Sequence, residues 1–168
     1  MNALLRSLFR SVPPLLALSA CAGLLAPPVT PGQSEADVVA RLGRPTNVYP
    51  VADGRLLEYM HGPMGQTTDM VKIGPDGRLQ SFEQVLTMEK FAVIVPDQTR
   101  QEQVLRTVGR PAERSRVAMR NYEVWSYRYR EAGVWNSLMH VHFDGQGVVR
   151  QMMNAPDPMY EPRDRFGF

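Results

Sequence analysis

Two stretches of the chain repeat one order of apolar and polar positions. The first spans residues 34–45, the second spans residues 99–111, and both end in Gly-Arg-Pro. Each opens with a hydroxyl residue, Ser34 or Thr99, that an acidic residue follows three positions later, which is typical of helix N-termini. Apolar residues then recur at the spacing of one helical face, and the closing Gly and Pro indicate a helix end. The pattern predicts one short capped helix in each stretch.

Alternating positions follow these helices and predict strands. Trp125, Tyr127 and Tyr129 lie at every second position, and the apolar residues of 139–143 do the same. Asp-Gly dipeptides suited to tight turns lie next to such segments. We therefore expect an α+β fold of two tandem repeats, each a helix followed by a three-stranded antiparallel sheet. The segment from Phe91 to Val95 is compatible with either a strand or a short helix.

The predicted repeats are small units. A repeat of about 65 residues buries little surface by itself, so we expect the two to pack together or to share one sheet. Segments rich in Pro flank them and are typical of semi-extended tethers and tails. The predicted parts are a signal peptide at 1–20, a Pro-rich tether at 21–31, a first repeat at 32–90, a second repeat at 91–155 and a Pro-rich tail at 156–168.

The amino terminus is typical of a secretory signal. Arg6 and Arg10 precede an apolar segment at 12–18, and small residues follow at Ser19 and Ala20. The apolar segment is interrupted by Pro and is shorter than the roughly 20 residues that span a bilayer. We therefore expect export and cleavage, not a membrane-spanning helix.

The last four residues of this signal carry further information. Leu-Ser-Ala-Cys at 18–21 resembles a lipobox, the site recognised by the lipoprotein signal peptidase. The resemblance implies cleavage between Ala20 and Cys21, a diacylglycerol on the Cys21 thiol and acylation of its new amino group. Several acyl chains together give firm membrane anchoring. Ala22, at the next position, resembles an outer-membrane sorting signal; a plain secreted protein whose signal ends in Cys is the alternative.

Charge and composition exclude several classes of protein. The 168 residues include 19 basic and 17 acidic ones; Arg6 and Arg10 precede Cys21, and without these two the balance is 17 to 17. Nucleic-acid binders need a strong basic excess, so we expect no nucleic-acid partner. Because Cys21 is the single cysteine, neither an intrachain disulfide nor a Cys-rich zinc site can form.

The repeated motifs resemble the BamE family of outer-membrane assembly lipoproteins, also called SmpA/OmlA. The family pattern joins a lipobox, a capped helix ending in Leu-Gly-x-Pro, a strand with Trp/Leu-x-Tyr, and Phe-Asp-x-x-Gly-x-Val. It is found at Leu42–Pro45 and Leu57–Tyr59, and again at 108–111, 125–127 and 143–148. The resemblance implies helices packed on a three-stranded antiparallel sheet. The family has one such unit and this chain has two; the tandem form is similar to the β-lactamase inhibitor protein, whose family relies on disulfides.

Catalytic chemistry has little support in the sequence. No Gly-rich phosphate loop, nucleophile elbow or metalloprotease helix is present, so we expect no enzyme activity and no cofactor. His140 and His142 point to the same side of a predicted strand and could both reach a metal. The matched positions of the first repeat hold Met70 and Lys72, and no third ligand is evident. We therefore interpret the pair as part of a solvated strand face and expect no metal.

The second repeat holds the candidate interaction residues. Its many arginines have two interpretations. They form a patch that binds anionic lipid headgroups or an acidic partner, or they form a solvated surface in which they pair with nearby glutamates. The aromatic face is either a set of interface anchors or the core of the repeat. The candidate residues for contact with a partner are Trp125, Tyr127, Arg128 and Arg130.

These observations favour a lipid-anchored envelope protein on the periplasmic face of the outer membrane. We expect a non-catalytic binding or scaffold component in outer-membrane protein assembly or envelope integrity. Its partners would be the membrane, through the lipid on Cys21, and envelope proteins such as the β-barrel assembly machinery. The alternative is a membrane-tethered inhibitor or binding module for a periplasmic enzyme.

Overall fold

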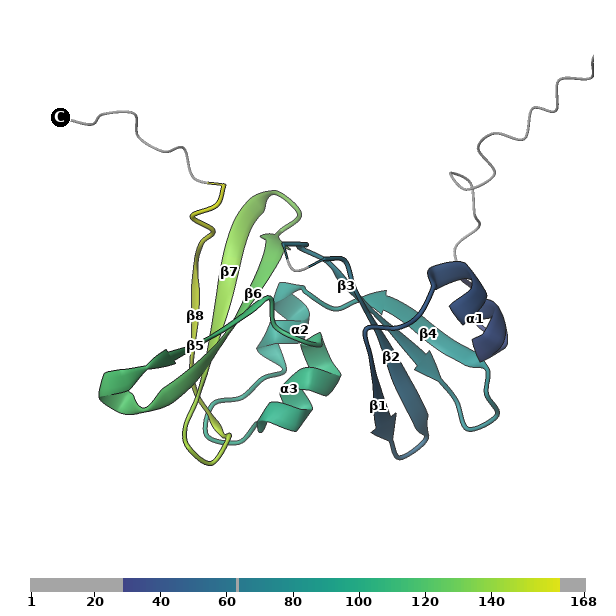
Figure 1. The fold of residues 1–168 in the computed structure, drawn as a ribbon, viewed down its shortest axis with the longest axis horizontal. Helices are drawn as coiled ribbons and strands as arrows, with labels where there is room; N and C mark the ends of the chain where they lie inside the picture. The colour runs from purple at the N-terminus through teal and green to yellow at the C-terminus, as the bar shows by residue number, and fades with distance from the viewer. Residues whose placement is uncertain (1–28, 63, 161–168) are drawn as a thin grey trace, which may run out of the picture.

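The computed structural model describes residues 29–62 and 64–160, which form two β-sheets with helices between and beside them (Figure 1). The predicted signal peptide, Cys21 and the chain from 161 onward lie outside the described residues. The first unit contains α1 (Glu35–Leu42), β1 (Asn47–Val51), β2 (Gly54–Met60), β3 (Thr68–Ile73) and β4 (Leu79–Gln84). The second contains α2 (Met88–Ala92), α3 (Gln101–Val108), β5 (Glu113–Val117), the 3-10 turn η2 (Ala118–Arg120), β6 (Tyr122–Glu131), β7 (Trp135–Phe143) and β8 (Val149–Pro156).

The predicted α+β fold of two helix-plus-three-stranded repeats is wrong. The described chain is mostly β: each sheet is antiparallel with four strands, in the orders β1-β2-β3-β4 and β5-β6-β7-β8, and the helices are short. The missed strands, β1 and β5, lie at sheet edges. β1 contains Pro50 and β5 reads Glu-Arg-Ser-Arg-Val, with every residue exposed. Edge strands tolerate Pro and charge and need no buried face, so the apolar pattern does not reveal them.

The predicted helix starts differ in accuracy. Ser34 caps α1 as predicted, because its hydroxyl accepts a hydrogen bond from the backbone of the third helical residue. α3 begins one residue later than predicted: Arg100 is its N-cap, and the Arg100 backbone N–H donates to Gln103 Oε1 at 2.8 Å. The Thr99 hydroxyl instead accepts from the Val95 N–H at 2.8 Å and shapes the loop before the helix.

Two predicted boundaries fall inside ordered structure. The boundary between residues 90 and 91 lies within α2, and Leu86 and Phe91 both belong to the core of the second unit. The predicted tail begins at Pro156, yet β8 extends to that residue and Asp157 is buried. Tertiary packing therefore extends the second unit in both directions.

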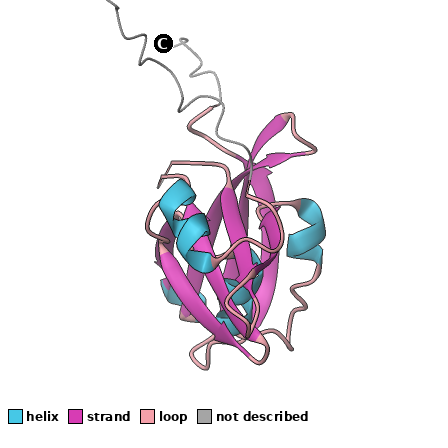
Figure 2. Ribbon diagram, turned by 90° about the vertical axis from the view of Figure 1, so that its right-hand side faces the viewer, coloured by secondary structure: helices cyan, strands magenta, loops and turns pink. Residues whose placement is uncertain are grey.

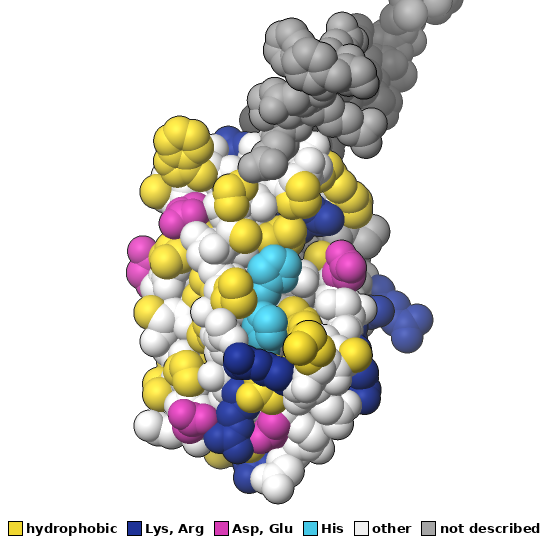
Figure 3. All heavy atoms as spheres, turned by 90° about the vertical axis from the view of Figure 1, so that its left-hand side faces the viewer, with side chains coloured by type: hydrophobic (Ala, Val, Ile, Leu, Met, Phe, Trp, Pro, Cys, Tyr) yellow, Lys and Arg dark blue, Asp and Glu magenta, His cyan; other side chains and the backbone are white. Residues whose placement is uncertain are grey.

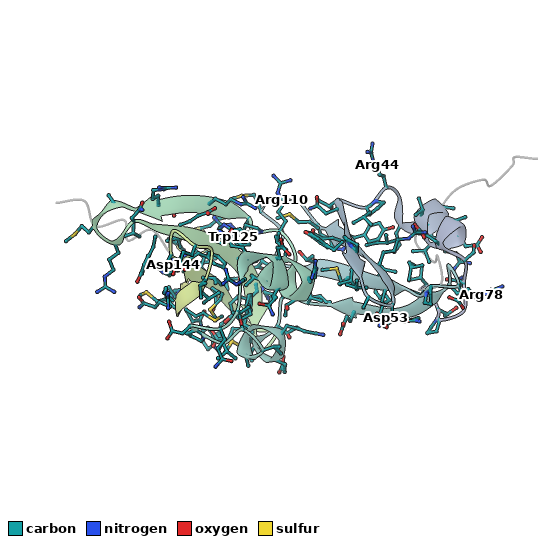
Figure 4. All side chains as sticks on the ribbon, turned by 90° about the horizontal axis from the view of Figure 1, so that it is seen from below. Arg44, Asp53, Arg78, Arg110, Trp125 and Asp144 are labelled. Carbon is teal, nitrogen blue, oxygen red and sulfur yellow. The ribbon has the colours of Figure 1, made fainter. Side chains whose placement is uncertain are left out.

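The elements lie in four layers, in the order α1, first sheet, α2 with α3, second sheet (Figures 1 and 4). α1 covers one face of the first sheet (Figure 2), and Val38 packs there with Leu57, Val71 and Ile73. α2 and α3 cover the inner face of the second sheet. The core of the second unit includes Phe91, Val104, Val108, Trp125, Tyr127, Tyr129, Val141 and Phe143.

The two units meet where the end of α3 reaches the first sheet. Glu58 is fully buried on β2; its Oε2 accepts from Asn47 Nδ2 at 2.9 Å and from the Tyr49 hydroxyl at 2.5 Å. Its Oε1 accepts from the Arg110 backbone N–H at 2.8 Å, and Gly109 lies directly beside it. A carboxylate is stable in such a place only when donors converge on it. Glu58 therefore joins the first sheet to the end of α3.

We expect Gly109→Ala to destabilise the protein far more than Gly43→Ala. Both glycines end a helix with positive φ, +78° and +82°, where an alanine costs about 1–2 kcal/mol. A Cβ on Gly109 would in addition lie 2.9 Å from Glu58 Oε1, whereas one on Gly43 would meet nothing within 4 Å. The overpacking adds roughly 1–3 kcal/mol to the loss at Gly109. Chemical denaturation measures both, and equal losses would contradict the close contact between the units.

Candidate interaction surface

The outer face of the second sheet has no covering layer among the described residues, whereas the first sheet carries α1 on one face and α3 against the other (Figure 1). Strand register places Ser126, His140 and Met153 in one row across that outer face, with Val124 and His142 in the next. Figure 3 shows two adjacent histidine side chains amid apolar and basic ones. The open face, as we define it, consists of Glu113, Ser115, Val124, Ser126, Arg128, Leu138, His140, His142 and Met153.

The centre of the open face combines apolar and neutral polar groups. Val124 and Leu138 are buried between their neighbours, while Met153 stays half exposed. The Ser126 hydroxyl and His140 Nδ1 lie 2.8 Å apart and form a hydrogen bond. A surface of this composition can be covered by a protein partner at a small desolvation cost, because few of its groups are charged.

The two histidines on this face have lowered pKa values. Burial is the main cause for both, since it disfavours the charged imidazolium. Glu113 opposes the decrease in the pKa of His140, whereas His140 and Arg120 add to the decrease in the pKa of His142. The described residues contain no cluster of three or more His, Cys, Asp or Glu suited to a metal ion. The pair is therefore part of a neutral surface near pH 7.

We expect acidification below the usual histidine pKa of 6.5 to destabilise the fold. The pKa values of the two histidines are lower in the folded than in the unfolded chain, so the unfolded chain binds more protons in this pH window. The free energy of unfolding therefore decreases as the pH falls through the window and keeps its full value above it. Replacing both His140 and His142 by Gln should reduce this loss, measured by denaturation at pH 5 to 8. An unchanged pH dependence in the double variant would contradict the assignment.

The candidate interaction residues fall into two groups. Trp125 and Tyr127 are 2% and 1% exposed and pack in the second core, so they have no surface with which to contact a partner. Arg128 forms a salt bridge with buried Asp157, and Arg130 is exposed and donates to Asn136 Oδ1 at 3.1 Å. Register places both arginines on the outer side of β6, with the open face. Ala20 and Cys21 lie outside the described residues.

Other arginines of the second unit also have partners. Arg106 lies 3.6 Å from Glu102, and Arg114 lies 3.9 Å from Glu123 and 4.5 Å from the centre of the Trp125 ring. Exposed ion pairs of this kind contribute about 0–1 kcal/mol each. These side chains thus match the interpretation as a solvated, paired surface better than a basic patch.

Glu113 and Ser126 lie opposite each other on β5 and β6, and the pattern of apolar positions does not reveal them. The corresponding pair on β1 and β2 is Asn47 and Glu58. Asn47 precedes Glu113 by 66 residues and Glu58 precedes Ser126 by 68. Gly43 and Gly109, and Leu57 and Trp125, have the same two offsets, so aligning the two repeats position by position would have found these pairs. Apolar periodicity gives no signal for them because none of the four residues is apolar.

The chain shows little similarity to known proteins. No family model and no curated protein matches the chain. Among solved structures, the chain is similar to a DUF4309 family protein (YjgB) from Bacillus subtilis subsp. subtilis str. 168, with 15% identity and a TM-score of 0.31. The match covers 74% of this chain and 79% of that one, and the low TM-score supports no conclusion about fold or function. None of the helices in the described ranges has the length and apolar character needed to cross a bilayer.

Proposed function

We propose that this chain is a lipid-anchored protein of the bacterial envelope that binds other proteins through the open face and has no catalytic role. The observation that carries the proposal is the difference between the two sheets. The first has α1 on one face and α3 against part of the other, while the second presents a partly apolar, mostly neutral face without a covering layer among the described residues. Partly apolar, weakly charged surfaces of this kind favour protein contacts.

The lipid anchor and the cellular role belong to the same proposal. The lipobox-like residues ending at Cys21 support attachment to the outer membrane with the folded units in the periplasm. The resemblance to the BamE family directs the proposed role to outer-membrane protein assembly or envelope integrity. Since each sheet has four strands where that resemblance implies three, the role depends on the tether and the open face and not on a shared fold.

The lipid anchor has a direct test. We expect cells producing the full chain to incorporate labelled palmitate into it, and Cys21→Ala to abolish the label and to move the protein from the membrane fraction to the soluble fraction. The thiol is the only possible thioether site, because the chain has one cysteine. A label that persists in the Cys21→Ala protein would contradict the assignment.

The open face is tested by photocrosslinking in intact cells. A photoreactive amino acid replaces Met153 on the open face or, as a control, Met64 in the first unit; the two are 48% and 47% exposed. We expect a defined crosslinked product from position 153 and none from position 64, with the captured protein identified by mass spectrometry. Assembly-machinery subunits would support the assembly role, and a single periplasmic enzyme would support the inhibitor alternative. No specific product from position 153 would refute binding through the open face.

A further inference from the structure

The first unit exposes a helix end that the second unit buries. α3 ends in Val108, which is buried in the core of the second unit, and in buried Gly109, which lies against Glu58 and Thr68 of the first sheet. α1 ends in the matching residues Leu42 and Gly43, which are both exposed, followed by exposed Arg44. Figure 4 shows the side chains of Arg44 and Arg110 projecting from the same side of the molecule. Within residues 29–62 and 64–160, one copy thus has one helix end and one sheet face that no other element covers.

The end of α3 is held from both sides, and that of α1 is not. The Tyr127 hydroxyl donates to the Gly109 carbonyl at 3.1 Å from the second sheet, while Glu58 accepts from the next backbone N–H. Tyr59 is the counterpart of Tyr127, yet its buried hydroxyl has no hydrogen-bond partner among the described residues. Within the described part of the chain, the first unit therefore shows neither of the two contacts that secure the equivalent helix end.

The open face matches the covered face of the first sheet in its polar groups. In the first sheet a row runs from Asn47 through Glu58 to Met70, and the matching row of the second runs from Glu113 through Ser126 to His140. Both rows pair one carboxylate with one uncharged hydrogen-bonding side chain. The carboxylate is on the central strand β2 in the first row (Glu58) and on the edge strand β5 in the second (Glu113). The open face thus keeps an acceptor for the backbone N–H groups at a helix end.

Charge also matches across the contact that this equivalence predicts. Asn47, Tyr49 and Arg110 line one hollow of about 370 Å³ between the units. Suppose that the α1 end of another copy lay on the open face as the α3 end lies on the first sheet. Glu113 would then take the place of Asn47, and Arg44 of that copy would take the place of Arg110. An arginine would then face a glutamate, which favours association more than the internal Arg–Asn pair does.

We propose that the open face binds the α1 end of a second copy of this chain, so that copies associate head to tail. The inference names the partner of the open face and depends on the function proposed for it. The contact is heterologous, since two different surfaces meet, and it continues the layer order of helix and sheet from one copy into the next. A contact of this type builds chains or closed rings and not a two-fold dimer.

Crosslinking between single-cysteine variants tests the arrangement. Arg44→Cys and Glu113→Cys are made separately in the full-length Cys21→Ala chain, purified, and treated with a short bismaleimide, alone and mixed. We expect a covalent dimer in the mixture, containing one chain of each kind, and none from either variant alone. A dimer from Glu113→Cys alone would indicate a face-to-face contact and overturn the proposal. Monomers in every sample would overturn it as well.

Charge reversal gives an independent measurement by sedimentation of the Cys21→Ala chain. Arg44→Glu alone or Glu113→Arg alone should raise the Kd for self-association at least about tenfold, and the double variant should restore it, because the pair is then reversed across the contact. Glu102→Arg is the control and should leave the Kd unchanged, since Glu102 lies 81% exposed on α3, away from both surfaces. Equal weakening by the control, or no rescue in the double variant, would overturn the proposal.

The photocrosslinking experiment separates failure of this inference from failure of the proposed function. Capture of another envelope protein at position 153, together with a monomeric chain in solution, would refute self-association and leave the binding role in place. Capture of a second copy at position 153 supports both. No capture at that position, with a monomeric chain, would refute both.

Discussion

Replacing Glu58 by Ala is expected to lower the free energy of unfolding by about 3–5 kcal/mol, through the loss of buried hydrogen bonds and of side-chain volume. The carboxylate is fully buried and accepts hydrogen bonds from Asn47, Tyr49 and the Arg110 backbone. Its removal leaves these donors without a partner at the junction of the two units. Urea denaturation of the purified protein measures the change.

Two variants give this experiment its controls. Glu58→Gln keeps the size of the side chain and an acceptor oxygen for the Arg110 N–H, so it should cost less than Glu58→Ala. Glu83→Ala removes a carboxylate in the same row of the sheet, where its pair with Lys90 is largely exposed and contributes about 0–1 kcal/mol. A loss at Glu58 as small as that at Glu83 would mean that the junction does not depend on this side chain.

Replacing Asp157 by Ala is expected to lower stability by about 3–5 kcal/mol, because it leaves the charge of a largely buried arginine without a partner. Asp157 is fully buried, and its carboxylate forms a salt bridge with Arg128, whose side chain is 13% exposed. It also accepts from the Met159 N–H at 3.0 Å, while its own N–H donates to the Asn136 carbonyl at 3.0 Å. The residue thus attaches the end of the described chain to β6 and β7.

The matched comparison is a surface ion pair. Glu102→Ala breaks the pair with Arg106, in which the glutamate is 81% exposed, and should change the free energy of unfolding by about 0–1 kcal/mol. Asp157→Asn keeps the acceptor for the Met159 N–H and should lose less than Asp157→Ala. If Asp157→Ala were as mild as Glu102→Ala, Arg128 would have to reach solvent without cost, and the buried salt bridge would have no role in stability.

Predictions from the sequence succeeded where the signal was local. The Ser34 cap needs only neighbouring residues, and the positive φ of Gly43 follows from the ending of the repeated helix motif. Alternation along β6 predicted that Trp125 and Tyr127 share a face. Alternation does not state whether a shared face is covered, which is why these two residues were candidates both for the core and for an interface.

The edge strands show where this reasoning fails. β5 consists of exposed and mainly polar residues, and β1 contains a proline. Each becomes a strand because an open edge of a neighbouring strand offers hydrogen bonds, a condition that depends on the rest of the sheet. The result is a four-stranded sheet in each unit and a mostly β chain, in place of the predicted three-stranded units.

The sequence by itself determined the lipobox-like motif ending at Cys21, the two repeated helix motifs and the alternation of the central strands, because each depends on residues close together in the chain. The tertiary structure alone decided that α3 lies between the sheets, that Glu58 joins the units and that the second sheet keeps an open face. These features depend on contacts between residues far apart in the chain, such as Glu58 and Arg110, which are 52 positions apart. No local pattern encodes such contacts, because they form only when separate units pack.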